Sequence, residues 1–139
     1  MGTSAGRIVC AGVAGAIATD AKRAGDLTAR YGGEEFAVVL PKTSAEGANV
    51  VARKICDGIA SLKLPHARSS IGPYVTLSGG SATAIPSAQE SPDTLILGAD
   101  SGLYQAKTQG KNRICHASSN IKSVSIGIVN SSSLLTVDC

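Results

Sequence analysis

The sequence predicts one compact domain in which helices and strands follow each other around a single apolar core. Its 139 residues fall within the range of roughly 100–200 residues typical of one domain. Apolar residues make up 43% of the chain and aromatic residues only 3%, so the core must consist mainly of Val, Ile, Leu and Ala. Segments with helical and with strand-like patterns alternate as far as residue 116, which predicts mixed α and β structure.

Charge and cysteine usage argue against several classes of protein. The formal net charge of +3 is too small and too dispersed for a nucleic-acid-binding surface. The four cysteines lie far apart without a C-x-x-C pair, which disfavours a zinc ribbon or a redox motif and favours reduced thiols. No apolar run reaches the roughly 20 residues that span a bilayer, and the first residues lack the features of a signal peptide. We therefore expect a cytoplasmic chain without nucleic acid or membrane partners, alone or as the cytoplasmic part of a membrane-anchored parent.

The first half of the chain predicts a helix, a hairpin and a second helix. Apolar residues at three- and four-residue spacing predict an Ala-rich helix over residues 8–19. Residues 27–31 and 36–40 predict two short strands, and the glycines between them permit a tight turn. Pro41 ends the second strand, and Ser44 is placed to cap a helix. The apolar face of that helix consists of Ala48, Val51, Ala52, Ile55, Ile59 and Leu62.

The second half predicts a strand, a third helix and a closing strand. Residues 74–78 are rich in β-branched and aromatic side chains, and the glycine pair at 79–80 is expected to end or bulge this strand. Residues 91–93 read SPD, a helix start with proline at the first helical position, and Gly110 is expected to terminate this helix. Residues 113–116 predict the start of a closing strand.

Residues 117–139 form a Ser-rich tail whose composition differs from that of the preceding domain, which we place at residues 1–116. The tail contains two β-prone runs, at residues 123–129 and 134–137.

The tip of the predicted hairpin is a candidate site for chemistry. Gly32 and Gly33 provide bare backbone that a ligand can approach, and Glu34 and Glu35 follow them directly. Mg²⁺ prefers such an oxygen-rich setting, usually sharing its coordination shell with substrate phosphates. Acidic residues are also common at solvated turns, so this pattern alone favours the simpler interpretation.

Two further pairs of charged residues each allow two interpretations. Lys107 and Lys111 stand four apart at the end of the third helix, on one side of it, where they could hold a polyphosphate or stabilise the negative end of the helix dipole. Arg23 and Asp26 could form a surface ion pair or recognise a guanine. A guanidinium donates to the Hoogsteen edge of that base and a carboxylate accepts from its amino groups.

Four motifs occur in a defined order along the chain. Residues 30–36 read RYGGEEF, residues 75–80 read VTLSGG, residues 99–107 read ADSGLYQAK, and residues 110–113 read GKNR. In this order the motifs resemble the GGDEF domain family of bacterial diguanylate cyclases, with the signature in its GGEEF form. The family joins two GTP molecules into cyclic di-GMP. The resemblance covers roughly residues 2–114, and chance convergence on four ordered motifs is improbable.

The resemblance implies roles for residues at matching positions. Glu34 resembles the carboxylate that binds Mg²⁺ or Mn²⁺ beside the reacting 3′-hydroxyl, and Glu35 belongs to the same signature and supports the active site. The two glycines before them resemble the turn that approaches the nucleotide. Lys107 and Lys111 match the cations that contact the triphosphate, a role that suits phosphoryl transfer.

Arg23 and Asp26 resemble the R-x-x-D inhibitory site of the family, at which the product cyclic di-GMP binds and restrains activity. The pair lies just ahead of the signature, in the register that the family uses. This position favours product binding over a plain ion pair.

The resemblance also implies a fold and an assembly. The fold is α+β, with a central, mostly antiparallel sheet flanked by helices, related to polymerase palm domains. Each subunit would hold one GTP, and two subunits would meet in a homodimer so that each 3′-hydroxyl attacks the other's α-phosphate. Relatives usually receive signals from an N-terminal sensory domain, and we expect one in the parent protein.

The N-terminal residues depart from the family pattern. Relatives begin with an apolar strand that ends in an aspartate, the other metal ligand, followed by Phe-Lys and Asn-Asp elements and a G-H-x-x-G-D stretch. Residues 2–7 match only that last stretch, with Thr3 at the His position and Arg7 at the Asp position. The two groups with which the family recognises guanine, the upstream Asn and the Asp now replaced by Arg7, are therefore missing from the register. Loss of a metal carboxylate, together with a cation where an acceptor for guanine belongs, should weaken binding and transition-state stabilisation, so we expect reduced activity.

The tail contains one candidate for the missing strand. Residues 134–139 read LLTVDC, which resembles that strand and places Asp138 where the first metal ligand would be. Either the tail returns to the sheet and brings Asp138 near Glu34, or it is an unrelated, frayed C-terminus. We favour the second interpretation because chain termini are often poorly ordered.

Three functions are compatible with the sequence. The chain is a diguanylate cyclase domain with product inhibition, a catalytically impaired module that binds cyclic di-GMP as a sensor, or a truncated or rearranged fragment without activity.

Overall fold

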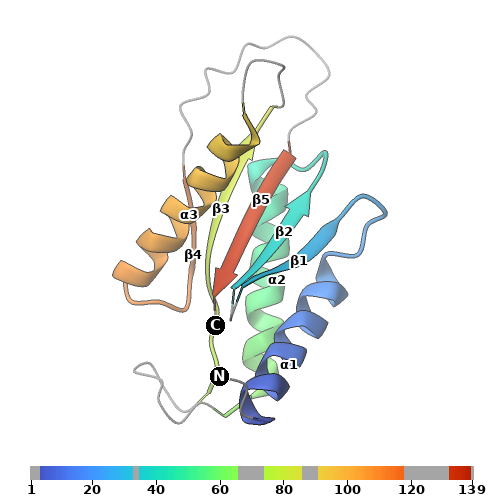
Figure 1. Ribbon diagram of the computed structural model, residues 1–139, viewed down its shortest axis with the longest axis vertical. Coiled ribbons are helices and arrows are strands. Elements are labelled where there is room, and N and C mark those ends of the chain that lie inside the picture. The colour runs from blue at the N-terminus through green and yellow to red at the C-terminus, as the bar shows by residue number, and fades with distance from the viewer. Residues whose placement is uncertain (1–3, 33–34, 66–73, 86–90, 118–131, 139) are drawn as a thin grey trace.

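The computed structural model of the chain describes residues 4–32, 35–65, 74–85, 91–117 and 132–138. In these ranges, helices pack on both faces of one sheet (Figure 1). The elements in chain order are α1 (Ser4–Asp20), β1 (Leu27–Gly32), β2 (Glu35–Leu40), α2 (Ala45–Leu62), β3 (Ser78–Ala84), α3 (Pro92–Thr108), β4 (Ile114–His116) and β5 (Ser132–Asp138). The predicted α+β class is confirmed.

The strands form a single sheet in the order β1-β2-β5-β3-β4. β1 and β2 are the antiparallel strands of the predicted hairpin. β5 is antiparallel to both β2 and β3, whereas the short edge strand β4 runs parallel to β3. The sheet is therefore mostly antiparallel, as the resemblance implies.

β5 lies in the middle of the sheet, although it comes from the Ser-rich tail. It pairs with β2 over six positions and with β3 over seven. Figure 1 shows it as the red arrow between these two strands. The favoured interpretation of a frayed C-terminus is therefore wrong, and the alternative, in which the tail returns to the sheet, is the one that the chain adopts.

Hydrogen bonding explains why the tail is ordered over this stretch. Without β5, the facing edges of β2 and β3 would each carry a row of unpaired N–H and C=O groups. Residues 134–137 are β-prone and satisfy both edges at once. The other β-prone run, residues 123–129, lies outside the described residues.

Different helices cover the two faces of the sheet. On β2, Phe36, Val38 and Leu40 are buried in the main apolar cluster together with residues of α1 and α2. The alternate residues Ala37 and Val39 pack instead against a smaller cluster that includes residues of α3. Successive strand residues point to opposite faces, so α1 and α2 cover one face and α3 covers the other. The core is otherwise aliphatic, as the composition predicts: among the residues whose burial the structure describes, Phe36 is the single buried aromatic side chain.

The strand predicted at residues 74–78 is shifted along the chain. β3 spans Ser78–Ala84, so the glycine pair lies within the strand instead of ending it. A Cβ added to Gly80 would overlap the carbonyl oxygen of Ala99 and the backbone nitrogen of Leu103. Glycine here lets α3 approach the sheet closely, which the local pattern does not reveal.

The three helix predictions are confirmed with changed bounds. α1 spans Ser4–Asp20 instead of residues 8–19. Ser44 and Ser91 cap α2 and α3 through their side chains, as their sequence positions predict. Leu62 was expected on the buried face of α2, but it is the last helical residue and is exposed. Within the described ranges, none of the helices is long and apolar enough to cross a membrane.

Candidate active site

The signature turn connects β1 and β2 at one end of the sheet. Gly32 ends β1 and Glu35 begins β2, and the two residues pair across the hairpin after an irregular step in the register. Glu35 is half-buried and, like Ala37 and Val39, lies on the face of β2 that is covered by α3. Gly33 and Glu34 lie outside the described residues. The predicted hairpin is confirmed, with Glu35 at the start of its second strand.

β5 and β3 bring two more residues to this end of the sheet. Asp138 pairs with Glu35 on one side and with Ser78 on the other. The row Glu35–Asp138–Ser78 joins three segments that are far apart in the sequence. β5 therefore ends beside the signature turn, the place that the alternative interpretation of the tail assigns to Asp138.

A left-handed turn after α3 reaches the same end of the sheet. Gly110, Lys111 and Asn112 have φ angles of 114°, 64° and 48°. The backbone N–H of Asn112 donates to Oγ of Ser78 at 3.2 Å. This bond fastens the turn to the first residue of β3, next to Asp138 in the sheet.

Lys107 and Lys111 approach this end in different ways. Lys107 lies in the last turn of α3, which ends at Thr108. Lys111 lies beyond the helix, and its backbone N–H donates to the carbonyl of Ala106 at 2.9 Å. Both lysines are exposed. The expectation that they share one side of the helix is wrong, because the helix ends before Lys111.

The R-x-x-D residues lie at the opposite end of the hairpin, directly before β1. Nη2 of Arg23 lies 3.3 Å from Oδ1 of Asp26, and Nε lies 3.4 Å from Oδ2. The backbone N–H of Arg23 also donates to Oδ2 at 3.0 Å. The Asp26 side chain is 2% exposed and that of Arg23 is 53% exposed. The predicted ion pair forms, and half of the arginine side chain remains accessible.

Thr43 belongs to the same group, and no signal in the sequence points to it. Its Oγ1 accepts a hydrogen bond from Nη2 of Arg23 and donates to the carbonyl of Pro41 at 3.0 Å. Thr43 is buried in the connection between β2 and α2. No motif contains it, and the signals around it, Pro41 and the cap Ser44, predict only the end of a strand and the start of a helix. Ser78 was missed for a similar reason, since it was read as an ordinary strand residue.

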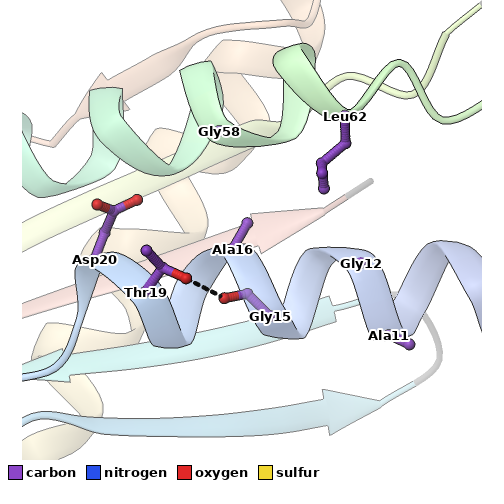
Figure 2. A pocket seen from close by; sticks show the side chains of 8 residues that line it. All are labelled: Ala11, Gly12, Gly15, Ala16, Thr19, Asp20, Gly58 and Leu62. Carbon is purple, nitrogen blue, oxygen red and sulfur yellow. Dashed lines mark hydrogen bonds between the residues drawn. The ribbon is translucent and has the colours of Figure 1, made fainter.

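A cavity of about 440 Å³ lies between α1 and α2 (Figure 2). Small residues such as Gly15 and Gly58 line it, with the carboxylate of Asp20 toward one end and Leu62 toward the other. The hydroxyl of Thr19 donates to the carbonyl of Gly15 at 2.9 Å. No predicted site residue lines this cavity, so it is separate from the signature turn.

A second, more polar cavity of about 530 Å³ lies between α2 and β4. Arg53, Cys56, Arg113 and His116 contribute to its lining. Burial, and secondarily the charge of Asp57, raise the pKa of the Cys56 thiol to about 11. The thiol is therefore neutral near pH 7 and is not an activated nucleophile.

The predicted metal site falls partly outside the described residues. Within the residues that the structure describes, no group of three or more His, Cys, Asp or Glu side chains could hold a metal ion. Glu34 is not among these residues. The pairing of β2 with β5 nevertheless brings the backbone of Asp138 beside Glu35, the neighbour of Glu34.

Comparison with known proteins relates the chain to one family. The profile described as "Diguanylate cyclase, GGDEF domain" matches residues 1–113. The chain is 37% identical over 94 residues to the response regulator PleD of Caulobacter vibrioides, covering 66% of this chain and 20% of that protein. It is 36% identical over 120 residues to diguanylate cyclase A of Treponema denticola, covering 86% of this chain and 31% of that protein. The chain thus spans between a fifth and a third of these curated relatives.

Among solved structures, the fold is similar to a crystal structure of the GGDEF domain of DgcB from Caulobacter crescentus in complex with c-di-GMP. The TM-score is 0.68 and the sequence identity 32%, and the match covers 81% of this chain and 64% of that chain. The similarity therefore extends over most of the described sheet and helices.

Proposed function

The chain belongs to the GGDEF domain family of diguanylate cyclases, and from this membership we propose that it condenses two GTP molecules into cyclic di-GMP and pyrophosphate. The observation that carries the proposal is the position of β5. This strand supplies the sheet position, and with Asp138 the aspartate, that the N-terminal residues lack. The expectation of reduced activity rested on that missing strand and on Arg7, a cation where an acceptor for guanine belongs, and β5 bears only on the first of these grounds.

Glu34 and Asp138 are the residues that would hold Mg²⁺ or Mn²⁺. The register supports this pairing, because Asp138 lies opposite the residue that follows Glu34. Carboxylate oxygens are the ligands that hard divalent cations prefer. When bound, the ion would neutralise negative charge on the reacting phosphates.

The remaining site residues position the nucleotide. Gly32 and Gly33 leave backbone accessible for close approach, and Glu35 supports the turn. Lys107 and Lys111 neutralise the triphosphate, and the turn that contains Lys111 is fastened to Ser78 beside the signature end.

The reaction consists of two equivalent phosphoryl transfers. In each, the 3′-hydroxyl oxygen of one GTP attacks the α-phosphorus of the other, the bond from that phosphorus to pyrophosphate breaks, and the hydroxyl proton is released. One subunit would hold one GTP, so catalysis requires a homodimer. We place the domain in the cytoplasm, regulated by an N-terminal sensory domain of the parent protein and by cyclic di-GMP bound at Arg23 and Asp26.

The direct test is incubation of the protein with GTP and Mg²⁺ over a range of protein concentrations, with chromatographic detection of cyclic di-GMP. We expect product whose rate per subunit rises with protein concentration, because the active species is a dimer. Glu34→Gln should abolish product, and Glu46→Gln, a change of an exposed carboxylate in the first turn of α2, should not. Absence of product from the unchanged chain at high concentration would refute cyclase activity.

A sensor that binds cyclic di-GMP without making it is the second candidate. Thr3 and Arg7 at the positions of the family's His and Asp favour it, because a cation stands where an acceptor for guanine belongs. Calorimetry should then detect cyclic di-GMP binding that Arg23→Ala abolishes and that Arg53→Ala, a change of an exposed arginine on α2, leaves intact. A chain that neither makes nor binds cyclic di-GMP would be a fragment without independent function.

A further inference from the structure

Thr43 holds one of the donors of Arg23 in a fixed direction. The threonine hydroxyl donates its proton to the carbonyl of Pro41 at 3.0 Å, so toward Arg23 it can act only as an acceptor. Nη2 of Arg23 donates to that oxygen. The contact joins residues 20 positions apart and links the R-x-x-D turn to the connection between β2 and α2.

The contact determines which arginine donors remain available. A guanidinium has five N–H donors. Asp26 takes the Nε donor and one Nη2 donor, and Thr43 takes the second Nη2 donor. Three of five donors are thus used, which leaves the two on Nη1 without a partner among the described residues. With the side chain of Arg23 half exposed, this edge of the guanidinium is presented to a ligand in one orientation.

The backbone around Thr43 supports the same geometry. Lys42 adopts a left-handed conformation, with φ of 53°, between Pro41 and Thr43. A Cβ added to Gly25 would lie 3.6 Å from Cγ of Pro41, so the R-x-x-D turn packs closely on this connection. The backbone on either side of the Arg23–Thr43 contact is therefore closely packed.

We propose that Thr43 is a positioning residue of the R-x-x-D site, holding the Arg23 guanidinium so that Nη1 donates to the acceptors of a guanine in a cyclic dinucleotide. The proposal rests on the proposed product binding at Arg23 and Asp26. It adds a third residue, which acts through Arg23 and does not itself touch the ligand.

Calorimetric titration with cyclic di-GMP tests the proposal in three variants. Thr43→Val keeps the volume and removes the hydroxyl, and we expect about fivefold to tenfold weaker binding, the size of one ordinary net hydrogen bond. Thr43→Ser restores the hydroxyl and should bind within about twofold of the unchanged chain. Thr108→Val removes an exposed hydroxyl that donates to the carbonyl of Gln105 at 3.1 Å, and should not change binding.

Repeating the Thr43→Val substitution in an Arg23→Lys variant, which lacks the guanidinium, distinguishes positioning of Arg23 from a general loss of structure. In Arg23→Lys, the ammonium cannot bond Asp26 and Thr43 in the same way, so adding Thr43→Val should cause little further loss of affinity. An equal loss in both backgrounds would show that Thr43 acts through the fold alone. Thr43→Ala serves the same comparison should the valine variant not fold.

Two results would overturn the proposal in different ways. Unchanged affinity in Thr43→Val, with binding abolished in Arg23→Ala, would show that Thr43 has no positioning role while the product site itself stands. Unchanged affinity in Arg23→Ala would remove the product site itself and Thr43 with it.

Discussion

The signature turn and the R-x-x-D turn lie at opposite ends of the β1–β2 hairpin, and they are assembled in different ways. The R-x-x-D end uses Arg23 and Asp26, directly before β1, and Thr43, 20 positions after Arg23 and shortly after the β1–β2 hairpin. The signature end joins the start of β2 to the end of β5, about 100 residues later in the chain, and to the start of β3. The R-x-x-D end therefore needs only the β1–β2 hairpin and its flanking turns, whereas the signature end depends on the completed sheet.

The largest expected effect comes from removing β5. A chain that ends at residue 131 would expose the facing edges of β2 and β3 and separate the hairpin from the β3–β4 pair. We expect loss of the whole folding free energy, typically about 5–15 kcal/mol for a domain. Circular dichroism during thermal unfolding measures this loss.

Addition of a synthetic peptide of residues 132–139 is the matching control, and it should restore a cooperative transition. A truncated chain that melts like the full-length chain would contradict the central role of β5.

The next largest effect distinguishes the signature end of the hairpin from the R-x-x-D end. Asp138→Asn should lower the rate of cyclic di-GMP synthesis by about 100-fold or more, because a metal ligand and its charge are lost. Affinity for cyclic di-GMP at Arg23 should stay the same, since that site lies at the far end of the hairpin. Chromatographic activity assays and calorimetry measure the two quantities. Equal losses of both would mean that the two ends are not independent.

Substitutions at two glycines, Gly80 on β3 and Gly15 on α1, test how closely α3 packs on the sheet. Gly80→Ala should destabilise the protein by about 3 kcal/mol, because the new methyl group overlaps the backbone of α3 at Ala99. Gly15→Ala, on α1, has nothing within 4 Å of the new Cβ and should stabilise the protein by about 0.5–1 kcal/mol. Urea denaturation measures both changes, and a similar sign for the two would be inconsistent with this packing.

The smallest expected effect concerns pH. The pKa of Cys56 rises from 9.0 to about 11 in the folded chain, so the folded state favours the neutral thiol. This contribution to stability is fully present below pH 9 and is lost as the pH rises from about 9 toward 11, where the unfolded state releases its proton first. The difference in melting temperature between the unchanged chain and Cys56→Ala should therefore shrink over that window. A difference that stays constant with pH would contradict the shift.

Local signals in the sequence predict much of the fold. The hairpin, the two serine caps and the three helices depend on residues close to one another, so periodicity and turn chemistry are sufficient to find them. The bounds of β3 were missed because Gly80 is a strand breaker by propensity and is required by the distant Ala99. The end of α3, in contrast, was found from a local signal: Gly110 follows the C-cap residue with a φ of 114°, and the N–H of Lys111 bonds the carbonyl of Ala106, which is the usual glycine-terminated helix end.

The long-range features were harder to predict. The resemblance of residues 134–139 to the missing strand was found, but the pairing that decides its place involves β2 and β3, which no local pattern specifies. Thr43 could not be predicted at all, because its role depends on a hydrogen bond to a side chain 20 positions away. The roles of Glu34, Lys107 and Lys111 remain predictions that rest on family membership.

The place of β5 in the sheet also affects how the chain is made. Ribosomes synthesise β5 after the other four strands of the sheet, so β2 and β3 emerge first with open edges on the two sides of an empty position. During that interval the nascent chain carries two strand edges able to pair with another molecule. The yield of folded protein should therefore depend on how quickly translation delivers β5, and conditions that delay its arrival should favour aggregation of incomplete chains.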